Sequence, residues 1–285
     1  MNINWFPGHM TKALRTMEGD LKLVDAVCEL ADARIPHASR NPALDALLGA
    51  KPRLLLLNRA DQADGAATKR WMAYFRSQGV SAMEADSKSG KGVAQFPAAV
   101  RSLLQEKLRA LAAKGQGGRP LRLMVVGIPN VGKSTFINRA AGRKAAAAAD
   151  RPGVTRGKQW VTLGTGLELL DTPGVLWPKI DDPAVGEYLA FTGAVKDDVL
   201  DVEELAARLM RLLAARYPAL LAARYKLTET GDQPGWALLE AAARKRGFLV
   251  SGGEADTLRM AGTLLDEFRG GRLGRVTLEE PPCSS

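Results

Sequence analysis

The sequence predicts an α/β protein with a doubly wound, mainly parallel sheet, followed by a small all-helical domain. Two short apolar runs, over 25–31 and 53–57, are typical of strands buried on both faces. A basic and aromatic helical segment follows the second run, so strands and helices alternate as they do in parallel sheets. After Trp177 this alternation stops, and the remaining segments have helical spacing.

The elements follow in order along the chain. The helix after the second strand ends at Gly79, and another helix is expected over 97–113. The glycine-rich stretch "AAKGQGGRP" then leads into the strand "LRLMVVG", which ends at Gly127. We interpret the glycine-rich stretch as a flexible joint.

The carboxyl-terminal third predicts helices. The stretch "DVEELAARLMRLLAARYPALLAARY" has helical spacing, with Asp201 as the N-cap and Glu204 at the capping-box position. Further helices are expected over 235–246 and 254–269, each followed by glycine. We therefore divide the chain into a sheet-containing domain, 1–178, and a helical domain, 179–285.

Composition limits the class of protein. With 285 residues, 46% of them hydrophobic, the chain can bury a large core. It has no apolar run of about 18 residues and no secretory signal, so we expect a soluble, cytoplasmic protein without membrane association. Cys28 and Cys283 form no metal or disulfide pattern and are expected to be reduced thiols.

The net charge of +9 is unevenly distributed. Residues 1–176 hold 26 Lys and Arg against 14 Asp and Glu, while 177–285 hold 14 against 17. Within the first part, residues 101–158 hold 13 basic and 2 acidic side chains. This surplus favours a polyanionic partner such as RNA, although a solvated basic face has the same pattern.

The segment "GIPNVGKS" fits the phosphate-loop pattern G-x-x-x-x-G-K-S, with a strand before it and a helix after it. Backbone N–H groups of such a loop surround the phosphates of a nucleotide, and the lysine reaches the β- and γ-phosphates. Ser134 would hold Mg²⁺, and Lys133 would also act in catalysis. The nucleotide-binding residues expected here are Asn130, Val131, Gly132, Lys133, Ser134 and Thr135.

The segment "LELLDTPG" is an apolar strand that ends in Asp171, which we expect to serve the Mg²⁺ from the side opposite Ser134. Gly174 would offer its N–H to the γ-phosphate. Between the two motifs, Thr155 of "DRPGVTRG" could close over the metal when a γ-phosphate is present, which would make it catalytic. Thr155 could equally be an ordinary surface-loop residue.

Two loops earlier in the chain are candidates for reading the base. In "NRAD", the carboxylate of Asp61 can accept both N1–H and the exocyclic amine of guanine, and adenine offers no such pair. Asn58 would tie this loop, which also contains Arg59 and Ala60, to the phosphate loop. In "ADSKSGKG", Asp86 and Ser87 form a second loop near the guanine carbonyl. Either loop alone could be an ordinary polar turn.

The base-reading loops thus come before the phosphate loop. Nucleotide sites in open α/β sheets form where the carboxyl ends of strands meet. A circular permutation, in which the original termini are joined and the chain begins at another point, therefore keeps the site intact. The order, together with "WFPGHMTKA", "ADARIPHASRNP", "NRAD", "GIPNVGKST", "RPGVT", "LLDTPGVLWPK" and "LAFTGAVKDD", resembles the circularly permuted P-loop GTPases of ribosome biogenesis. The resemblance extends to about residue 200. It departs at Arg59, where members of the family usually have lysine.

The resemblance implies GTP and GDP as ligands, Mg²⁺ as a cofactor, and the large (50S) ribosomal subunit precursor, with its rRNA and ribosomal proteins, as the partner of a monomer. It also implies that His9 positions the attacking water and that Asn130 helps to bind K⁺. From chemistry alone, His9 could instead cap a turn, and Asn130 could satisfy local backbone groups. Val175 and Leu176 stand where many GTPases have a water-orienting Gln, so we expect slow intrinsic turnover that the subunit stimulates.

Two other functions are considered. The protein could be a nucleotide-gated RNA-binding module in which hydrolysis is incidental, and substitution of His9 would separate the two. In either case we expect RNA contact from the helical domain and from six basic residues: Arg139, Arg143, Lys144, Arg151, Arg156 and Lys158. An ATP-dependent enzyme acting on a small molecule is disfavoured by Asp61 and by the lack of a second catalytic constellation.

Overall fold

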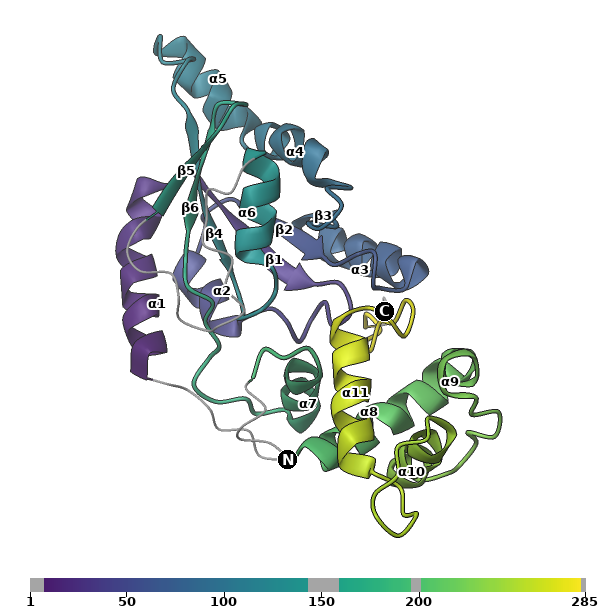
Figure 1. Cartoon of the computed structure of the whole chain (residues 1–285). Coiled ribbons are helices and arrows are strands. Elements are labelled where there is room, and N and C mark those ends of the chain that lie inside the picture. Colours follow the sequence, from purple (N-terminus) through teal and green to yellow (C-terminus); the bar gives the residue numbers. More distant parts are fainter. Residues whose placement is uncertain (1–7, 143–158, 196–200, 283–285) are drawn as a thin grey trace. The chain divides into compact units, whose positions relative to one another are not determined.

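The computed structural model describes residues 8–142, 159–195 and 201–282 (Figure 1). These residues divide into two compact units. The sheet unit contains 8–181 together with the last described residues, 279–282, and the helical unit contains 182–278.

The sheet unit is built on six strands in the spatial order β3-β2-β1-β4-β6-β5. Neighbours are parallel except for the pair β5 and β6, which is antiparallel. Burial along nearly all of β1, β2 and β4 indicates cover on both faces, as expected of a doubly wound sheet. The strands are β1 Ala26–Asp32, β2 Arg53–Asn58, β3 Ser81–Glu84, β4 Leu121–Gly127, β5 Gln159–Leu163 and β6 Leu167–Asp171.

Helices cover this sheet. On one side Trp71 and Phe75 of α3 pack on Leu55 and Leu57 of β2. Helices α4 and α6 contact each other through an edge-to-face pair of Phe96 and Phe136, with ring centroids 4.9 Å apart. Helix α6 lies in front of the sheet in Figure 1. The helices of the unit are α1 Gly8–Asp20, η1 Leu21–Leu23, α2 Pro42–Leu48, α3 Gly65–Ser77, η2 Val93–Gln95, α4 Phe96–Leu103, α5 Gln105–Ala113 and α6 Lys133–Ala141.

The single helix expected over 97–113 was wrong, because the structure has two helices that are separated at Leu104. Leu104 is buried with non-helical backbone angles, whereas α5 after it buries none of its residues. The chain therefore turns where the apolar face that packs on the sheet ends. Helices α1 and α2 and the edge strand β5 were not predicted from the sequence.

The described residues of the helical unit form α7 to α11, and Asp201 caps α8 by accepting a hydrogen bond from the N–H of Glu204 at 3.0 Å. The long helical stretch that begins there is divided before Pro218, because proline has no N–H to continue a helix. Gly235 lets α10 pack closely on α8, since a Cβ there would lie 1.9 Å from the carbonyl oxygen of Ala207. The bounds are α7 Pro183–Phe191, α8 Val202–Arg216, α9 Pro218–Tyr225, α10 Gly235–Lys245 and α11 Thr257–Arg269.

The topology brings three motifs to one edge of the sheet. From β1 the chain builds outward through β2 and β3, whereas after β4 it crosses to the edge strand β5 and returns as β6 beside β4. The boundary between β1 and β4 is a topological switch point, where open α/β sheets bind their ligands. Base-loop, phosphate-loop and D-x-x-G segments follow the carboxyl ends of β2, β4 and β6.

A search of the described residues for a helix long and apolar enough to span a membrane found no candidate.

Candidate functional site

The phosphate loop connects β4 to α6 and depends on two glycines. A Cβ on Gly127 would lie 2.6 Å from the backbone oxygen of Leu30, so the loop leaves β4 where no side chain fits. Gly132 has a φ of +99°, a conformation that L side chains rarely adopt. These positions allow the backbone to curve into an anion cradle at the beginning of α6.

Lys133 is buried beneath this loop. Its Nζ donates to the backbone oxygens of Gly127 at 3.1 Å and Ile128 at 2.8 Å. Burial lowers the pKa of Lys133 to about 8, and the negative charge of Asp171 only partly opposes this effect. Gly174 lies close by, because a Cβ there would be 2.8 Å from the backbone of Pro129 and 2.9 Å from the Lys133 Nζ. The lysine and the D-x-x-G segment therefore meet at the phosphate loop.

Asp171 ends β6 and is also buried. Within the described residues, neither of its carboxylate oxygens has a partner in hydrogen-bonding geometry. Burial raises the pKa of this carboxyl, and Lys133, the Thr172 N–H and the Ser134 hydroxyl act in the opposite direction. A buried carboxylate with a serine hydroxyl beside it offers the hard oxygen ligands that Mg²⁺ prefers. Asp171 and Ser134 therefore fit the metal that a phosphate loop uses.

Asn58 joins three loops. Its Nδ2 donates to the backbone oxygen of Val131 at 2.8 Å, and its Oδ1 accepts from the N–H and the hydroxyl of Ser87 at 3.2 and 2.6 Å. The side chain is buried, so these bonds do not compete with bulk water. One amide thus connects the first base loop to the phosphate loop and to the second base loop.

Arg59 and Asp61 follow Asn58 in the first base loop. Arg59 has a left-handed φ of +59°, and its guanidinium donates to the Asn130 backbone oxygen at 2.7 Å. It also lies 3.7 Å from the carboxylate of Asp32. Asp61 is exposed to solvent, and Ala60 donates its N–H to Ala85 at 3.2 Å. The arginine thus binds the phosphate loop while the Asp61 carboxylate stays accessible.

The second base loop runs from Asp86 to Gly90, directly after β3. Its Asp86 carboxylate accepts the N–H of Lys88 at 2.8 Å, and the backbone oxygen of Asp86 accepts the N–H of Gly90 at 2.8 Å. Burial would raise the pKa of Asp86, but hydrogen bonds from Ser89 and Lys88 and the charge of Arg139 lower it. The loop is a closed turn around an ionised carboxylate.

The loop that follows β1 lies in the segment "ADARIPHASRNP", but the sequence assigned no role to its individual residues. Asp32 and Arg34 form a buried ion pair with an N–O distance of 2.7 Å, and Asn41 donates its Nδ2 to the backbone oxygen of Val175 at 3.1 Å. This loop therefore connects the first base loop, through Arg59, to the segment after D-x-x-G. The sequence signal that could have indicated it is an acidic and a basic residue two positions apart, in "DAR", at the end of an apolar strand.

The segment after D-x-x-G is buried. Val175 and Leu176 are both 0% exposed, and the N–H of Val175 donates to the Gly127 oxygen at 3.3 Å. Neither side chain can hold a water molecule by a hydrogen bond, and neither faces solvent.

Some expected site residues cannot be placed. His9 lies in the first turn of α1, but its side chain is outside the described part, as is Thr155 with both its backbone and side chain. Of the six basic residues assigned to RNA contact, Arg139 is described, and its guanidinium is bonded to the second base loop. The others, Arg143, Lys144, Arg151, Arg156 and Lys158, lie outside the described residues.

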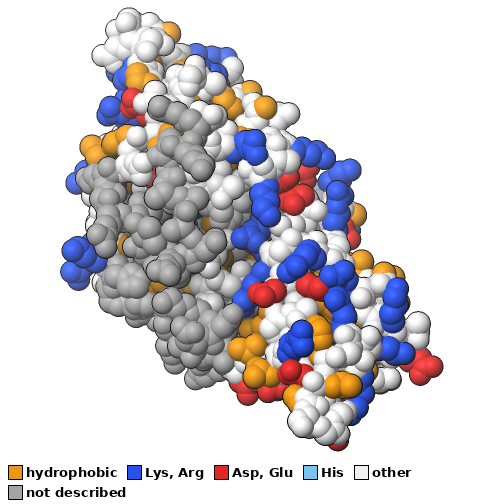
Figure 2. Space-filling view, viewed as in Figure 1, with side chains coloured by type: hydrophobic (Ala, Val, Ile, Leu, Met, Phe, Trp, Pro, Cys, Tyr) orange, Lys and Arg blue, Asp and Glu red, His pale blue; other side chains and the backbone are white. Residues whose placement is uncertain are grey.

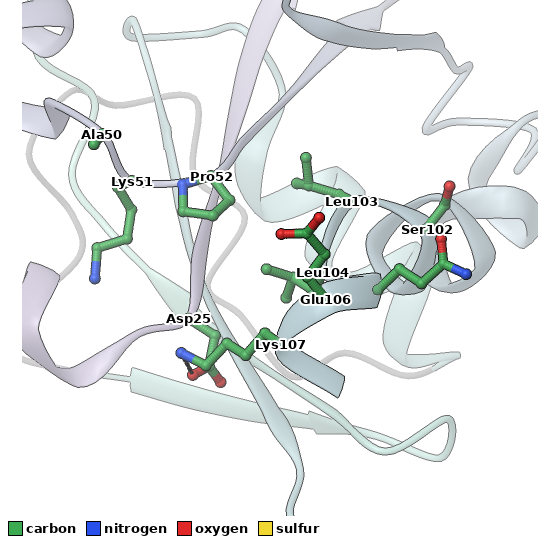
Figure 3. Close-up of a pocket in the computed structure, with 10 residues that line it drawn as sticks. Asp25, Ala50, Lys51, Pro52, Ser102, Leu103, Leu104, Glu106 and Lys107 are labelled. Carbon is green, nitrogen blue, oxygen red and sulfur yellow. Dashed lines mark ion pairs between the residues drawn. The ribbon is translucent and has the colours of Figure 1, made fainter. Parts of the chain in front are cut away.

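A hollow of about 700 Å³ lies at the amino ends of the strands, opposite the loops described above (Figure 3). Asp25 and Pro52, which line it, directly precede β1 and β2, so the hollow is at the amino ends of the strands. Asp25 is paired there with Lys107 at 2.6 Å and with Arg119 at 2.7 Å. The hollow is therefore separate from the loops described above.

A phosphate loop, a buried acidic residue at the metal position and two base loops at one sheet edge define a P-loop GTPase. Because both base loops precede the phosphate loop, the domain is a circularly permuted GTPase. As a GTPase, the protein hydrolyses GTP. Residues 122–217 match the family described as "50S ribosome-binding GTPase". The chain belongs to the family of ribosome biogenesis GTPase A.

Full-length relatives support this assignment. The chain is 47% identical over 282 residues to ribosome biogenesis GTPase A of Priestia megaterium, covering 99% of this chain and 98% of that protein. It is 35% identical to mitochondrial ribosome-associated GTPase 1 of Mus musculus, covering 98% and 91%. A GDP-bound structure of YlqF from Thermotoga maritima has a TM-score of 0.69 and 27% identity, covering 94% and 99%.

Proposed function

We propose that this GTPase is a cytoplasmic switch that acts at a late step in assembly of the large (50S) ribosomal subunit. Its intrinsic turnover would be slow, and the subunit precursor would stimulate it. The names of the relatives support a role in ribosome biogenesis. The observation that carries the partner-dependent part is the complete burial of Val175 and Leu176 where a water-orienting side chain would otherwise stand.

The proposed chemistry assigns a task to each residue of the site. Asp61 accepts the N1–H and amine of guanine, and Ser87 lies beside the base carbonyl. Lys133 turns from its loop carbonyls toward the β- and γ-phosphates when a nucleotide enters. Asp171 and Ser134 would hold Mg²⁺, which neutralises charge on the phosphate oxygens when bound.

Two parts of the catalytic proposal rest on the family resemblance: His9 is proposed to orient the attacking water, and Asn130 to help bind K⁺. Thr155 is proposed to close over the metal because it lies between the phosphate loop and the D-x-x-G segment. Asn130 has a left-handed φ of +58°, and its carbonyl is held by Arg59. This fixed backbone supports a defined direction for the Asn130 side chain, as a monovalent-cation site requires.

The proposed partner is the rRNA and protein surface of the subunit precursor, with which the protein would associate as a monomer. The surplus of Lys and Arg in residues 1–176 supports attraction to a polyanion, and Figure 2 shows where basic side chains lie on the drawn face of the described residues. The helical unit is proposed to contribute recognition of shape, because residues 177–285 carry no basic surplus.

The test is GTP turnover with purified large subunits, with small subunits as the matched control, in KCl and in NaCl. We expect strong stimulation by large subunits in KCl and little with small subunits. The variant Lys133→Ala, assayed in parallel, reports any hydrolysis by contaminants. Tight GTP binding with turnover that ignores both subunit and cation would contradict the ribosomal and the K⁺ proposals.

The alternative is a nucleotide-gated RNA-binding module in which hydrolysis is incidental. The burial of Val175 and Leu176 directly after D-x-x-G favours this alternative, because the segment offers no side chain that could orient a water for hydrolysis. His9→Ala distinguishes the two: a switch loses its assembly role with its turnover, whereas a module keeps it.

A further inference from the structure

Arg139 connects the phosphate-loop helix to the second base loop. It lies on α6, which begins at Lys133, and its Nε donates to the backbone oxygen of Ser87 at 3.3 Å. Its Nη2 donates to the backbone oxygen of Lys88. A side chain that is 52 residues away along the chain from Ser87 thus binds the two carbonyls at the centre of the base loop.

The packing around Arg139 supports this contact. A Cβ on Gly90 would lie 3.1 Å from the Cδ of Arg139, so the backbone of the loop rests on the arginine stem. Gly90 also has a φ of +93°, a backbone conformation that favours glycine, so both the φ angle and the close contact with Arg139 disfavour a side chain there. The charge of Arg139 also helps to lower the pKa of Asp86, whose carboxylate organises the same turn.

The loop is held from several directions. Asn58 accepts the N–H and hydroxyl of Ser87, and the Asp86 carboxylate accepts the N–H of Lys88. Both of these contacts come from the base-reading part of the chain. Arg139 adds a contact from the phosphate-binding part, which in this permuted order is joined to the base loops through the glycine-rich stretch 114–120.

We propose that Arg139 is a positioning residue for guanine recognition, and that it acts by holding the carbonyls of Ser87 and Lys88. This inference rests on the proposed role of the second base loop, and it assigns Arg139 a task other than the RNA contact expected from its charge.

The experiment compares Arg139→Gln with a matched control, Arg101→Gln. Arg101 on α4 also donates to a loop carbonyl, that of Thr165 at 2.6 Å, but this turn lies at the opposite edge of the sheet. Affinities are measured for GDP, for IDP and for inorganic pyrophosphate, which has no base. Steady-state GTP hydrolysis and the melting temperature of each variant are measured alongside.

For Arg139→Gln we expect about tenfold weaker binding of GDP and IDP, because charged donors to two carbonyls are lost. Pyrophosphate affinity and kcat should stay unchanged while KM rises by the same factor. Arg139→Lys, which keeps the charge and one donor, should recover part of the GDP affinity. Arg101→Gln should change none of these affinities.

Two outcomes would overturn the inference. In the first, Arg139→Gln binds GDP as tightly as the parent protein, whether or not its RNA affinity falls. In the second, GDP and pyrophosphate weaken by equal factors together with a lower melting temperature, which would mean a general structural role. Asp61→Asn separates this failure from failure of the guanine site: if it weakens GDP binding while Arg139→Gln does not, only the role of Arg139 is wrong.

Discussion

Replacing Asn58 by alanine should break the connection between the base and phosphate loops. The substitution leaves the Val131 carbonyl and the Ser87 N–H without their partner in a buried place, while the Ser87 hydroxyl can rotate. Each unpaired buried group costs about 1–3 kcal/mol. The two groups together therefore cost about 2–6 kcal/mol, shared between folding stability and nucleotide affinity. If most of it falls on binding, the Kd for GDP rises at least about 30-fold.

Asn58→Asp refines the test, because it keeps the shape and the acceptor for Ser87. It places a second carboxylate oxygen against the Val131 carbonyl oxygen, where the amide donated at 2.8 Å. GDP binding should weaken in this variant too, and more so above the pKa of the new carboxyl. Asn41→Ala is the matched control, since Asn41 is also buried and also donates to a carbonyl, that of Val175. It should lower stability with much less effect on GDP affinity.

The assay is equilibrium titration of each purified variant with a fluorescent GDP analogue, with thermal melting in the presence and absence of GDP. The reasoning is refuted if folded Asn58→Ala binds GDP within about threefold of the parent protein.

Three further predictions concern burial and charge. Val175→Gln should not accelerate hydrolysis, because position 175 faces the core, and it should lower the free energy of unfolding by about 2–4 kcal/mol in a denaturant titration. Gly174→Ala should impair hydrolysis strongly and GDP binding weakly, since its Cβ would lie 2.8 Å from Pro129; equal loss of both would contradict this. Glu267 is buried, which disfavours its charge, but hydrogen bonds from Arg224 and Tyr225 outweigh burial and lower its pKa from 4.5 to about 2. Since a depressed pKa stabilises the fold above the unfolded-state value, the helical unit should lose about 2 kcal/mol as pH falls from about 4.5 toward 2. Melting curves of Glu267→Gln should lack this dependence.

The sequence predicted the parts of the sheet that carry strong local signals. The phosphate-loop strand before Gly127 and the apolar run before Asn58 became β4 and β2, because uninterrupted apolar residues identify strands covered on both faces. The edge strand β5 gave no such signal, since only part of it is buried. The division at Leu104 was also missed, because it depends on where the sheet ends.

In the candidate site, the sequence predicted the motif residues but not the contacts that hold the loops together. Motif spacing pointed to Lys133 and Asp171, and the structure places them together beneath the phosphate loop. The contacts of Arg139 and Asn41 could not be read from the chain, because each binds a backbone carbonyl of a distant segment. A carbonyl is present in every residue, so such a contact leaves no mark on the identity of its partner.

We propose that loops early in the chain read guanine for a phosphate loop that comes later. The most direct test is the affinity of Asp61→Asn for GDP and for XDP, measured beside the parent protein. Asparagine can donate to the 2-carbonyl of xanthine and no longer accepts the guanine amine, so we expect GDP to weaken about 100-fold and XDP to tighten. An Asp61→Asn protein that binds GDP unchanged and gains no affinity for XDP would contradict the account.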